Sequence, residues 1–254
     1  MARAQGLLGL LEEQALAKIG DYTSQGISLT LWAYATLGIQ PGEEMVDGLE
    51  RQAAGLMTGF NSQDIAMTLR AYAKLGIRPR AGIVAGLERR WQARRVMGEF
   101  QPREISHALW AYATLRLVPG AGLLDDVERR AASLMNSDRF NPQDLSMYLR
   151  ACATLGIRPG RAISAAIEKR VTADIGCFNA QGLSNTLWAY AAFDQKPGGN
   201  TQNLLCEAAN LFAAEGSLSH ENIQQLHTFL LVSELQGWHA PEDAANPACI
   251  LRSR

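Results

Sequence analysis

The segment LWAYATLGIQP, residues Leu31–Pro41, is the strongest indication of the fold because it recurs along the chain. Its further copies are LRAYAKLGIRP (Leu69–Pro79), LWAYATLRLVP (Leu109–Pro119), LRACATLGIRP (Leu149–Pro159) and LWAYAAFDQKP (Leu187–Pro197). The copies start at residues 31, 69, 109, 149 and 187, so the period is 38–40 residues. Such a period is typical of architectures in which each unit buries its apolar face against the next. The sequence therefore predicts an all-α protein, a right-handed α-solenoid of 38–40-residue helix–turn–helix repeats.

Each repeat carries a recognisable start for its first helix. In FNPQDL, Asn141 suits the N-cap, Pro142 the first helical position, and Asp144 the positive helix end. Phe140 and Leu145 have the spacing of a hydrophobic staple. The same start recurs at Phe60–Ile65, Phe100–Ile105, Phe178–Leu183 and, more loosely, Tyr22–Ile27.

Glycine marks the end of three first helices, at Gly38, Gly76 and Gly156, where a left-handed residue can close the helix. Arg116 and Asp194 occupy the same slot in the third and fifth repeats, so we expect those helices to end differently. A second helix should follow each proline and carry the segments GLERQAAGLM, GLERRWQARRVM, DVERRAASLM and AIEKRVTADI. A glutamate lies nine residues after the proline in each, at Glu50, Glu88, Glu128 and Glu168.

The repeats organise nearly the whole chain. We predict an array over residues 1–236, with a partial repeat at 1–21, repeats starting near 22, 60, 100, 140 and 178, and a degenerate repeat near 218. Residues 237–254 should form an irregular tail. Leu11-Glu12 lies 38 residues before Leu49-Glu50, so we expect the chain to begin in mid-repeat, as a fragment would.

Composition excludes several classes of protein. The net charge of −1 gives no bulk attraction to polyanions, so a nucleic-acid site must come from local clustering. The four cysteines form no CxxC pair, which favours reduced structural thiols. No apolar run has the length of a membrane span, and Glu12 and Glu13 interrupt any signal peptide. We expect no membrane association.

Chemistry-bearing motifs are missing from the sequence. The four histidines form no HExxH motif, and there is no GxSxG, P-loop or metal-spaced Cys/His set. We therefore expect no enzyme, no cofactor, no metal and no small-molecule substrate.

Helical phase identifies the face of each first helix that is left for a ligand. With the aromatic before the cap as position zero, positions 5, 9 and 12 (Ile65, Leu69 and Tyr72) should face the core. Positions 6, 11 and 13 are mostly Ser or Ala and should let neighbouring first helices approach. Positions 3, 7, 10 and 14 remain, and none of these twenty residues in five helices is acidic. We call them the candidate face. They are Gln25, Leu29, Trp32, Thr36, Gln63, Met67, Arg70, Lys74, Arg103, His107, Trp110, Thr114, Gln143, Met147, Arg150, Thr154, Gln181, Asn185, Trp188 and Ala192.

The chemistry of this face suits single-stranded RNA. Position 10 alternates between Trp and Arg, whose flat groups can stack on bases, and position 3 is Gln or Arg throughout. The residues predicted to bind RNA are Gln25, Trp32, Gln63, Met67, Arg70, Lys74, Arg103, His107, Trp110, Gln143, Met147, Arg150, Gln181, Asn185 and Trp188. Alternatively, the tryptophans pack against adjacent repeats and Arg is tolerated through its aliphatic stem. The basic pairs of the second helices, such as Lys169-Arg170, are expected to be solvated.

The repeat segment FNAQGLSNTLWAYA, Phe178–Ala191, resembles the octotricopeptide repeat proteins of green algae and related organellar RNA-binding repeats. The resemblance extends from about Tyr22 to Gln236, and Glu221–Trp238 is similar to the segment that precedes a RAP domain in many such proteins. Within the 254 residues we expect neither a RAP domain nor a transit peptide.

The resemblance implies RNA recognition by an α-solenoid, with one nucleotide per repeat, in a chloroplast or mitochondrion. The expected roles are transcript stabilisation, processing, splicing or translational activation, together with other proteins of an organellar ribonucleoprotein. The alternative is a protein-interaction scaffold that uses the concave face of the solenoid, which the near-zero net charge and residues such as Leu29, Met67 and Met147 would suit.

Overall fold

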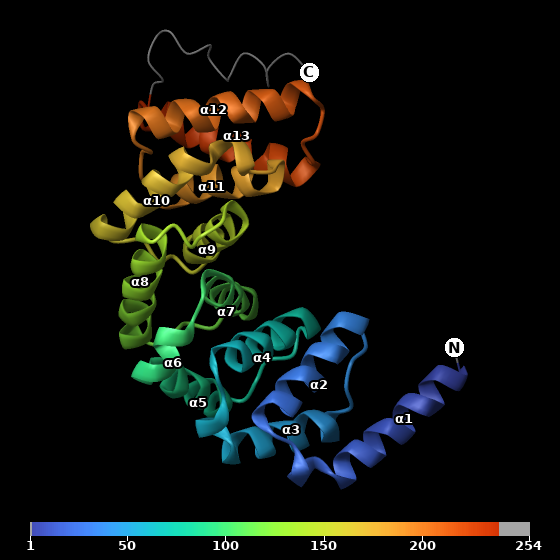
Figure 1. Cartoon of the computed structure of the whole chain (residues 1–254). Helices are drawn as coiled ribbons and strands as arrows, with labels where there is room; N and C mark the ends of the chain where they lie inside the picture. Colours follow the sequence, from blue (N-terminus) through green and yellow to red (C-terminus); the bar gives the residue numbers. More distant parts are fainter. Residues whose placement is uncertain (1, 239–254) are drawn as a thin grey trace. The chain divides into compact units, whose positions relative to one another are not determined.

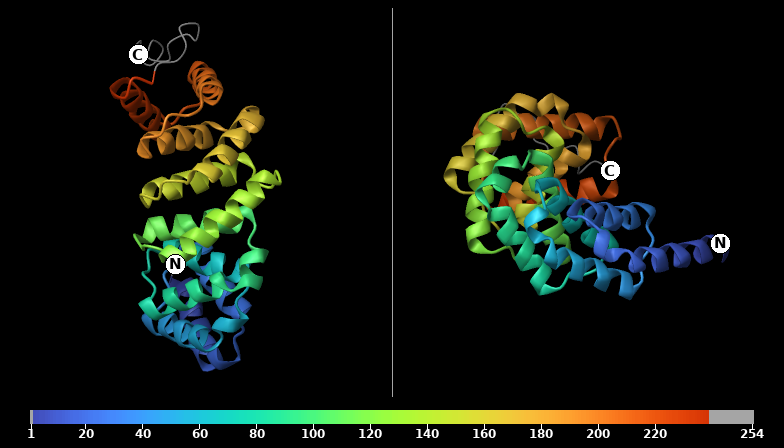
Figure 2. Two further views of the ribbon diagram at one scale, coloured as in Figure 1. Left: turned by 90° about the vertical axis from the view of Figure 1, so that its left-hand side faces the viewer. Right: turned by 60° about the horizontal axis from the view of Figure 1, so that its bottom comes forward.

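The computed structural model describes residues 2–238, and every regular element in that range is a helix (Figures 1 and 2). The predicted all-α class is confirmed. The tail beyond Trp238, including Cys249 and His239, lies outside the described residues. No helix among the described residues is long and apolar enough to cross a membrane.

First and second helices alternate along the chain as the repeat pattern predicts (Figure 1). The first helices are α2 (Ser24–Leu37), α4 (Ser62–Leu75), α7 (Pro102–Leu115), α9 (Pro142–Thr154), α11 (Ala180–Ala192) and α13 (His220–Leu235). The second helices are α1 (Ala2–Ala17), α3 (Glu43–Gly55), α5 (Ala81–Gln92) with its continuation α6 (Arg94–Glu99), α8 (Ala121–Asn136), α10 (Arg161–Asp174) and α12 (Gly199–Ala214).

The chain divides into two compact units, which we describe separately. The first contains Met1–Phe100 and Thr114–Val127, and the second contains Gln101–Ala113 and Glu128–Arg254. In the first unit α2 packs against α4, and α3 contacts both α1 and α5. In the second unit α11 lies between α9 and α13, and α10 contacts α12. Within each unit, like helices thus pack on like helices, as in a helical-repeat protein.

The predicted helix starts are confirmed. The side-chain oxygens of Asn61, Asn141 and Asn179 each accept a hydrogen bond at 2.8 Å from the backbone N–H three residues later. Asn61 and Asp64 form a complete capping box. These caps satisfy N–H groups that a helix start would otherwise leave without partners.

The helix ends correct one expectation. Gly38, Gly76 and Gly156 take the left-handed conformation, with φ of 66°, 67° and 69°. Arg116 and Asp194 were expected to end their helices differently, but they adopt the same conformation, with φ of 53° and 49°. The reason is the closing hydrogen bond: after Asp194, the N–H of Gln195 still donates to the carbonyl of Tyr190 at 3.1 Å. Closure of the turn therefore prevails over the steric cost of a Cβ.

The second helix of the second repeat was predicted to be continuous, but the structure divides it into α5 and α6. It breaks at Ala93, which has φ −57° and ψ 122°, before α6 begins. Trp91, fully buried, stacks on Phe100 with ring centroids 4.5 Å apart. Burial of this large side chain accompanies the break, and helical phase alone does not predict it.

The predicted core is confirmed. Positions 5, 9 and 12 are buried in all five predicted first helices: Ile27, Leu31, Tyr34, Ile65, Leu69, Tyr72, Ile105, Leu109, Tyr112, Leu145, Leu149, Cys152, Leu183, Leu187 and Tyr190. Among the basic pairs, the prediction of a solvated face is wrong for Arg170. That side chain is buried and pairs with Asp138 and Asp174.

The periodic glutamates form a bond between successive repeats. In each case Oε1 accepts from the backbone N–H at the start of the next second helix, 30 or 32 residues later. The pairs are Glu12 with Gly42, Glu50 with Arg80, Glu88 with Gly120, Glu128 with Gly160 and Glu168 with Gly198, at 2.9–3.3 Å. A Cβ at Gly160 would lie 2.6 Å from the Glu128 carboxylate. The same bond forms at Arg80, which has a Cβ, so the glutamate side chain can shift and glycine is not required for this link.

Candidate nucleic-acid interface

The candidate face lies largely where helical phase places it. Position 14 is exposed in all five helices, position 3 is exposed in four of them, and position 10 is half-buried throughout. Position 7 varies: Leu29 is exposed, Met67, His107 and Met147 are half-buried, and Asn185 is buried. A half-buried side chain is held in place and still offers one edge to a ligand.

In the first unit, the ring of Trp32 on α2 carries two cations from α4. The guanidinium carbon of Arg70 and the Nζ atom of Lys74 each lie 5.0 Å from the ring centroid. Cation–π contacts of this kind contribute about 0.5–1 kcal/mol at exposed sites. Trp32 therefore packs against the neighbouring repeat through contacts with two cationic side chains. Of these, the Lys74 side chain is exposed. Exposed Gln25 and Gln63 belong to the same pair of helices.

In the second unit, Arg103 and Gln143 are exposed, and His107, Trp110, Met147 and Trp188 are half-buried. Burial raises the pKa of Asp144, while the Arg103 guanidinium and the hydrogen bond from Asn141 act in the opposite direction.

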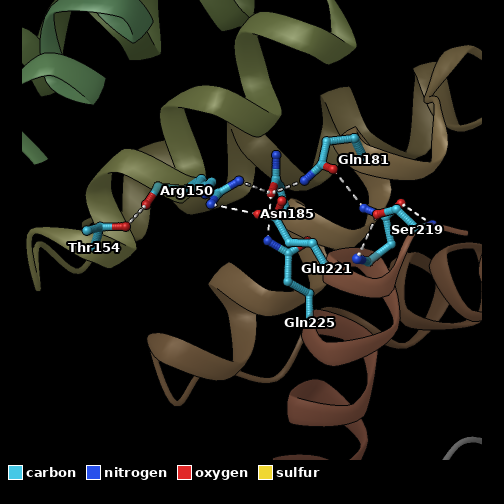
Figure 3. A network of polar contacts seen from close by, with 8 residues as sticks. Arg150, Thr154, Gln181, Asn185, Ser219, Glu221 and Gln225 are labelled. Carbon is cyan, nitrogen blue, oxygen red and sulfur yellow. Dashed lines mark hydrogen bonds and ion pairs between the residues drawn. The ribbon is translucent and has the colours of Figure 1, made fainter. Parts of the chain in front are cut away.

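Asn185 is the member of the predicted set that the structure does not place on the exposed surface. It is 7% exposed, and its Oδ1 atom accepts hydrogen bonds from three side chains (Figure 3). The donors are Arg150 Nη1 at 3.1 Å, Gln181 Nε2 at 3.1 Å and Gln225 Nε2 at 2.9 Å. We therefore do not assign Asn185 a direct contact with RNA. Its role is to position its three neighbours.

Arg150 fixes the direction of every amide in this network. A guanidinium only donates, so Asn185 must turn its oxygen toward Arg150, and both glutamines must then turn their nitrogens toward that oxygen. Gln181 Oε1, facing away, accepts from Asn222 Nδ2 at 2.8 Å. Gln225 Oε1 is buried and has no hydrogen-bond partner among the described residues. The network is therefore specific in geometry but not fully satisfied.

A second nitrogen of Arg150, Nη2, forms an ion pair with a carboxylate. Arg150 Nη2 lies 2.9 Å from Glu221 Oε1, and the two side chains are 39% and 52% exposed (Figure 3). Glu221 and Gln225 were missing from the predicted site because the phase count stopped at the fifth repeat. Counting from Leu218 as position zero places Glu221 at position 3 and Gln225 at position 7 of α13. Extending the count into the degenerate repeat would have found both.

Among the described residues, no three His, Cys, Asp or Glu side chains are grouped to hold a metal ion. Cys152, Cys177 and Cys206 form no disulfide, and burial raises the pKa of Cys152 to about 12 and of Cys206 to about 11. Both buried thiols therefore stay protonated at neutral pH.

Paired helices that pack like on like within each unit define a helical-repeat protein. Residues 7–200 match the family model of the RNA-editing substrate-binding complex 6 protein, and the chain belongs to this family. The match covers about three quarters of the chain. No curated protein matches the sequence. The finer resemblance to octotricopeptide repeats stays a prediction.

Proposed function

We propose that this chain binds single-stranded RNA through the candidate face, as a non-catalytic subunit of an RNA-editing substrate-binding complex. Membership of a family named for such a complex supports the RNA partner and the presence of other proteins. The observation that carries the assignment is the cluster of Trp32, Arg70 and Lys74. An aromatic ring and two cations come together there on neighbouring helices.

The cluster suits the two parts of a nucleotide. Lys74 and Arg70 would neutralise phosphates, and a face of the Trp32 ring or the guanidinium plane of Arg70 would stack on a base. Arg103 would add a phosphate contact in the second unit, and the exposed position-3 glutamines Gln25, Gln63 and Gln143 would hydrogen-bond to base edges. Sequence selectivity, if each repeat reads a different nucleotide, would come from position 7, which is the most varied. Leu29 and Met67 stand there in the first unit and His107 and Met147 in the second.

The location is part of the proposal. We place the activity in an organelle, as the resemblance to organellar repeat proteins implies. The family description gives no support to the chloroplast in particular.

Binding of a mixed pool of single-stranded RNA should be measured over a range of salt concentrations. For the chain, log K should fall linearly with log salt, by about 0.7 per phosphate contact. Arg70→Glu with Lys74→Glu should weaken binding at least about tenfold and reduce that slope. The matched control is Arg51→Glu with Arg89→Glu, two exposed second-helix residues of the same unit. Equal affinities for the two double variants, with intact helical circular dichroism, would remove this face from the site.

The alternative, a protein-interaction scaffold, is favoured by one observation in the second unit. An apolar hollow between α11, α12 and α13 is lined mainly by Leu187, Cys206, Leu226, Phe229 and Leu230. Failure of the folded chain to retain RNA even at low salt would favour this second function.

A further inference from the structure

We propose that the Arg150 guanidinium is a phosphate subsite of the candidate face, and that Glu221 closes it until RNA displaces the carboxylate. This inference rests on the proposed RNA-binding function. It adds that Glu221 opposes RNA binding, and that it does so at Arg150 in the second unit.

The guanidinium is already arranged as a fork for oxygen atoms. Nη1 is held by Asn185 Oδ1 at 3.1 Å, and Nη2 faces Glu221 Oε1 at 2.9 Å. A planar guanidinium donates readily to both carboxylate and phosphate oxygens. A phosphate oxygen in the place of Glu221 Oε1 would therefore meet the same donor without any change in the Arg150 rotamer.

The two oxygens that hold Arg150 differ in how firmly they are fixed. Asn185 is buried, and its oxygen accepts from Gln181 and Gln225 as well as from Arg150. Glu221 is 52% exposed, and among residues 2–238 its side chain makes one ion pair, to Arg150, and no other side-chain hydrogen bond. Exposed ion pairs are weak and are screened by salt. Asn185 is thus a permanent positioning residue, and Glu221 is a replaceable ligand.

The identity of residue 221 departs from the pattern of the repeats. Position 3 is Gln25, Gln63, Arg103, Gln143 and Gln181 in the first five repeats and an acid only in the sixth. Those earlier residues carry no charge that repels phosphate. Glu221 lies on α13, and its side chain contacts Arg150 on α9; α11 packs against both of these helices (Figure 3). Its carboxylate both occupies Arg150 and repels an approaching phosphate.

The test compares Glu221→Gln with Glu207→Gln, which removes the same charge from an exposed position of α12 in the same unit. Glu221→Gln should bind mixed single-stranded RNA about three- to tenfold more tightly, with a salt slope steeper by about 0.7, the value of one added phosphate contact. Glu207→Gln should change affinity much less. In an Arg150→Gln background the gain from Glu221→Gln should disappear, because the donor it releases is absent.

The outcomes separate this inference from the proposed function. If the chain binds RNA and Glu221→Gln binds it no more tightly than Glu207→Gln, Glu221 does not block Arg150. The inference then fails, and the proposed RNA-binding function stands. If the gain in affinity persists in the Arg150→Gln background, it comes from the change in net charge, and Arg150 is not the phosphate subsite. If neither the chain nor Glu221→Gln retains RNA at low salt, the proposed function and the inference fail together. RNA binding by Glu221→Gln alone would support both.

Discussion

Glu168 Oε1 accepts a hydrogen bond from the backbone N–H of Gly198 at 3.0 Å, thirty residues further along the chain. The bond joins α10 to the start of α12 in the second unit and gives a partner to an N–H that the α12 start would leave without one. Its counterparts at Glu12, Glu50, Glu88 and Glu128 show that this is a standard link between repeats within each unit. The recurring glutamate is therefore a structural residue.

We expect Glu168→Ala to lower the free energy of unfolding by about 1–2 kcal/mol, because it removes a charge-assisted bond at a helix start. Glu168→Gln keeps an acceptor of the same shape and should cost less. Urea denaturation followed by circular dichroism measures both. Glu207→Ala serves as the exposed control, and an equal loss in that variant would show that the inter-repeat bond does not stabilise the fold.

Replacement of the two non-glycine residues that close first helices should stabilise the protein. Arg116 and Asp194 hold φ of 53° and 49°, a conformation that costs about 1–2 kcal/mol for a residue with a Cβ and less for Asp. After the extra entropy of glycine in the unfolded chain is subtracted, Arg116→Gly should gain about 0.5–1 kcal/mol and Asp194→Gly less.

The reverse substitution is made at Gly76, a glycine that closes a first helix at φ 67°. Gly76→Ala should lose about 1 kcal/mol. Thermal unfolding of the three variants is the measurement. A decrease in melting temperature for Arg116→Gly would show that its side chain contributes more than the backbone strain costs.

Asp144→Asn should make stability less dependent on pH. Burial raises the pKa of Asp144 in the folded protein, so the folded state binds a proton more readily than the unfolded chain. Stability of the parent should therefore decline as pH rises from the unfolded pKa of about 3.9 through the raised folded value. The variant lacks this decline and should be the more stable protein at neutral pH, whereas the two should converge in acid.

Urea midpoints measured at several pH values from about 4 to about 7 test this expectation. Asp21→Asn, at an exposed carboxylate, should leave the profile unchanged. A stability gain for Asp144→Asn that is the same at every pH would contradict ionisation as the cause.

Trp32→Ala should weaken RNA binding about five- to tenfold, because it removes both a stacking surface and the ring that holds Arg70 and Lys74. Trp32→Phe keeps a smaller aromatic face and should lose less. Fluorescence anisotropy with labelled single-stranded RNA at constant salt measures the loss. Unchanged affinity for Trp32→Ala would mean that the tryptophan only packs between repeats.

Much of the fold was predictable because its signals are local. Asn61 and Asp64 are three residues apart, and Ile65, Leu69 and Tyr72 share a helix face by phase alone, so caps and core could be read without knowledge of neighbours. The same phase placed the exposed residues of the candidate face, although the sequence does not show what they touch.

The helical class, the paired helices, their caps and the buried stripe follow from the amino-acid order alone, since these features depend on 3.6-residue periodicity and on contacts within one turn. The packing of the helices was needed to show that Arg70 and Lys74 lie over the ring of Trp32, that Asn185 is buried, and that Arg150 faces Glu221. Those contacts join side chains about one or two repeats apart on different helices. Helix packing distance and side-chain reach bring them together, and no periodicity within a single repeat specifies either.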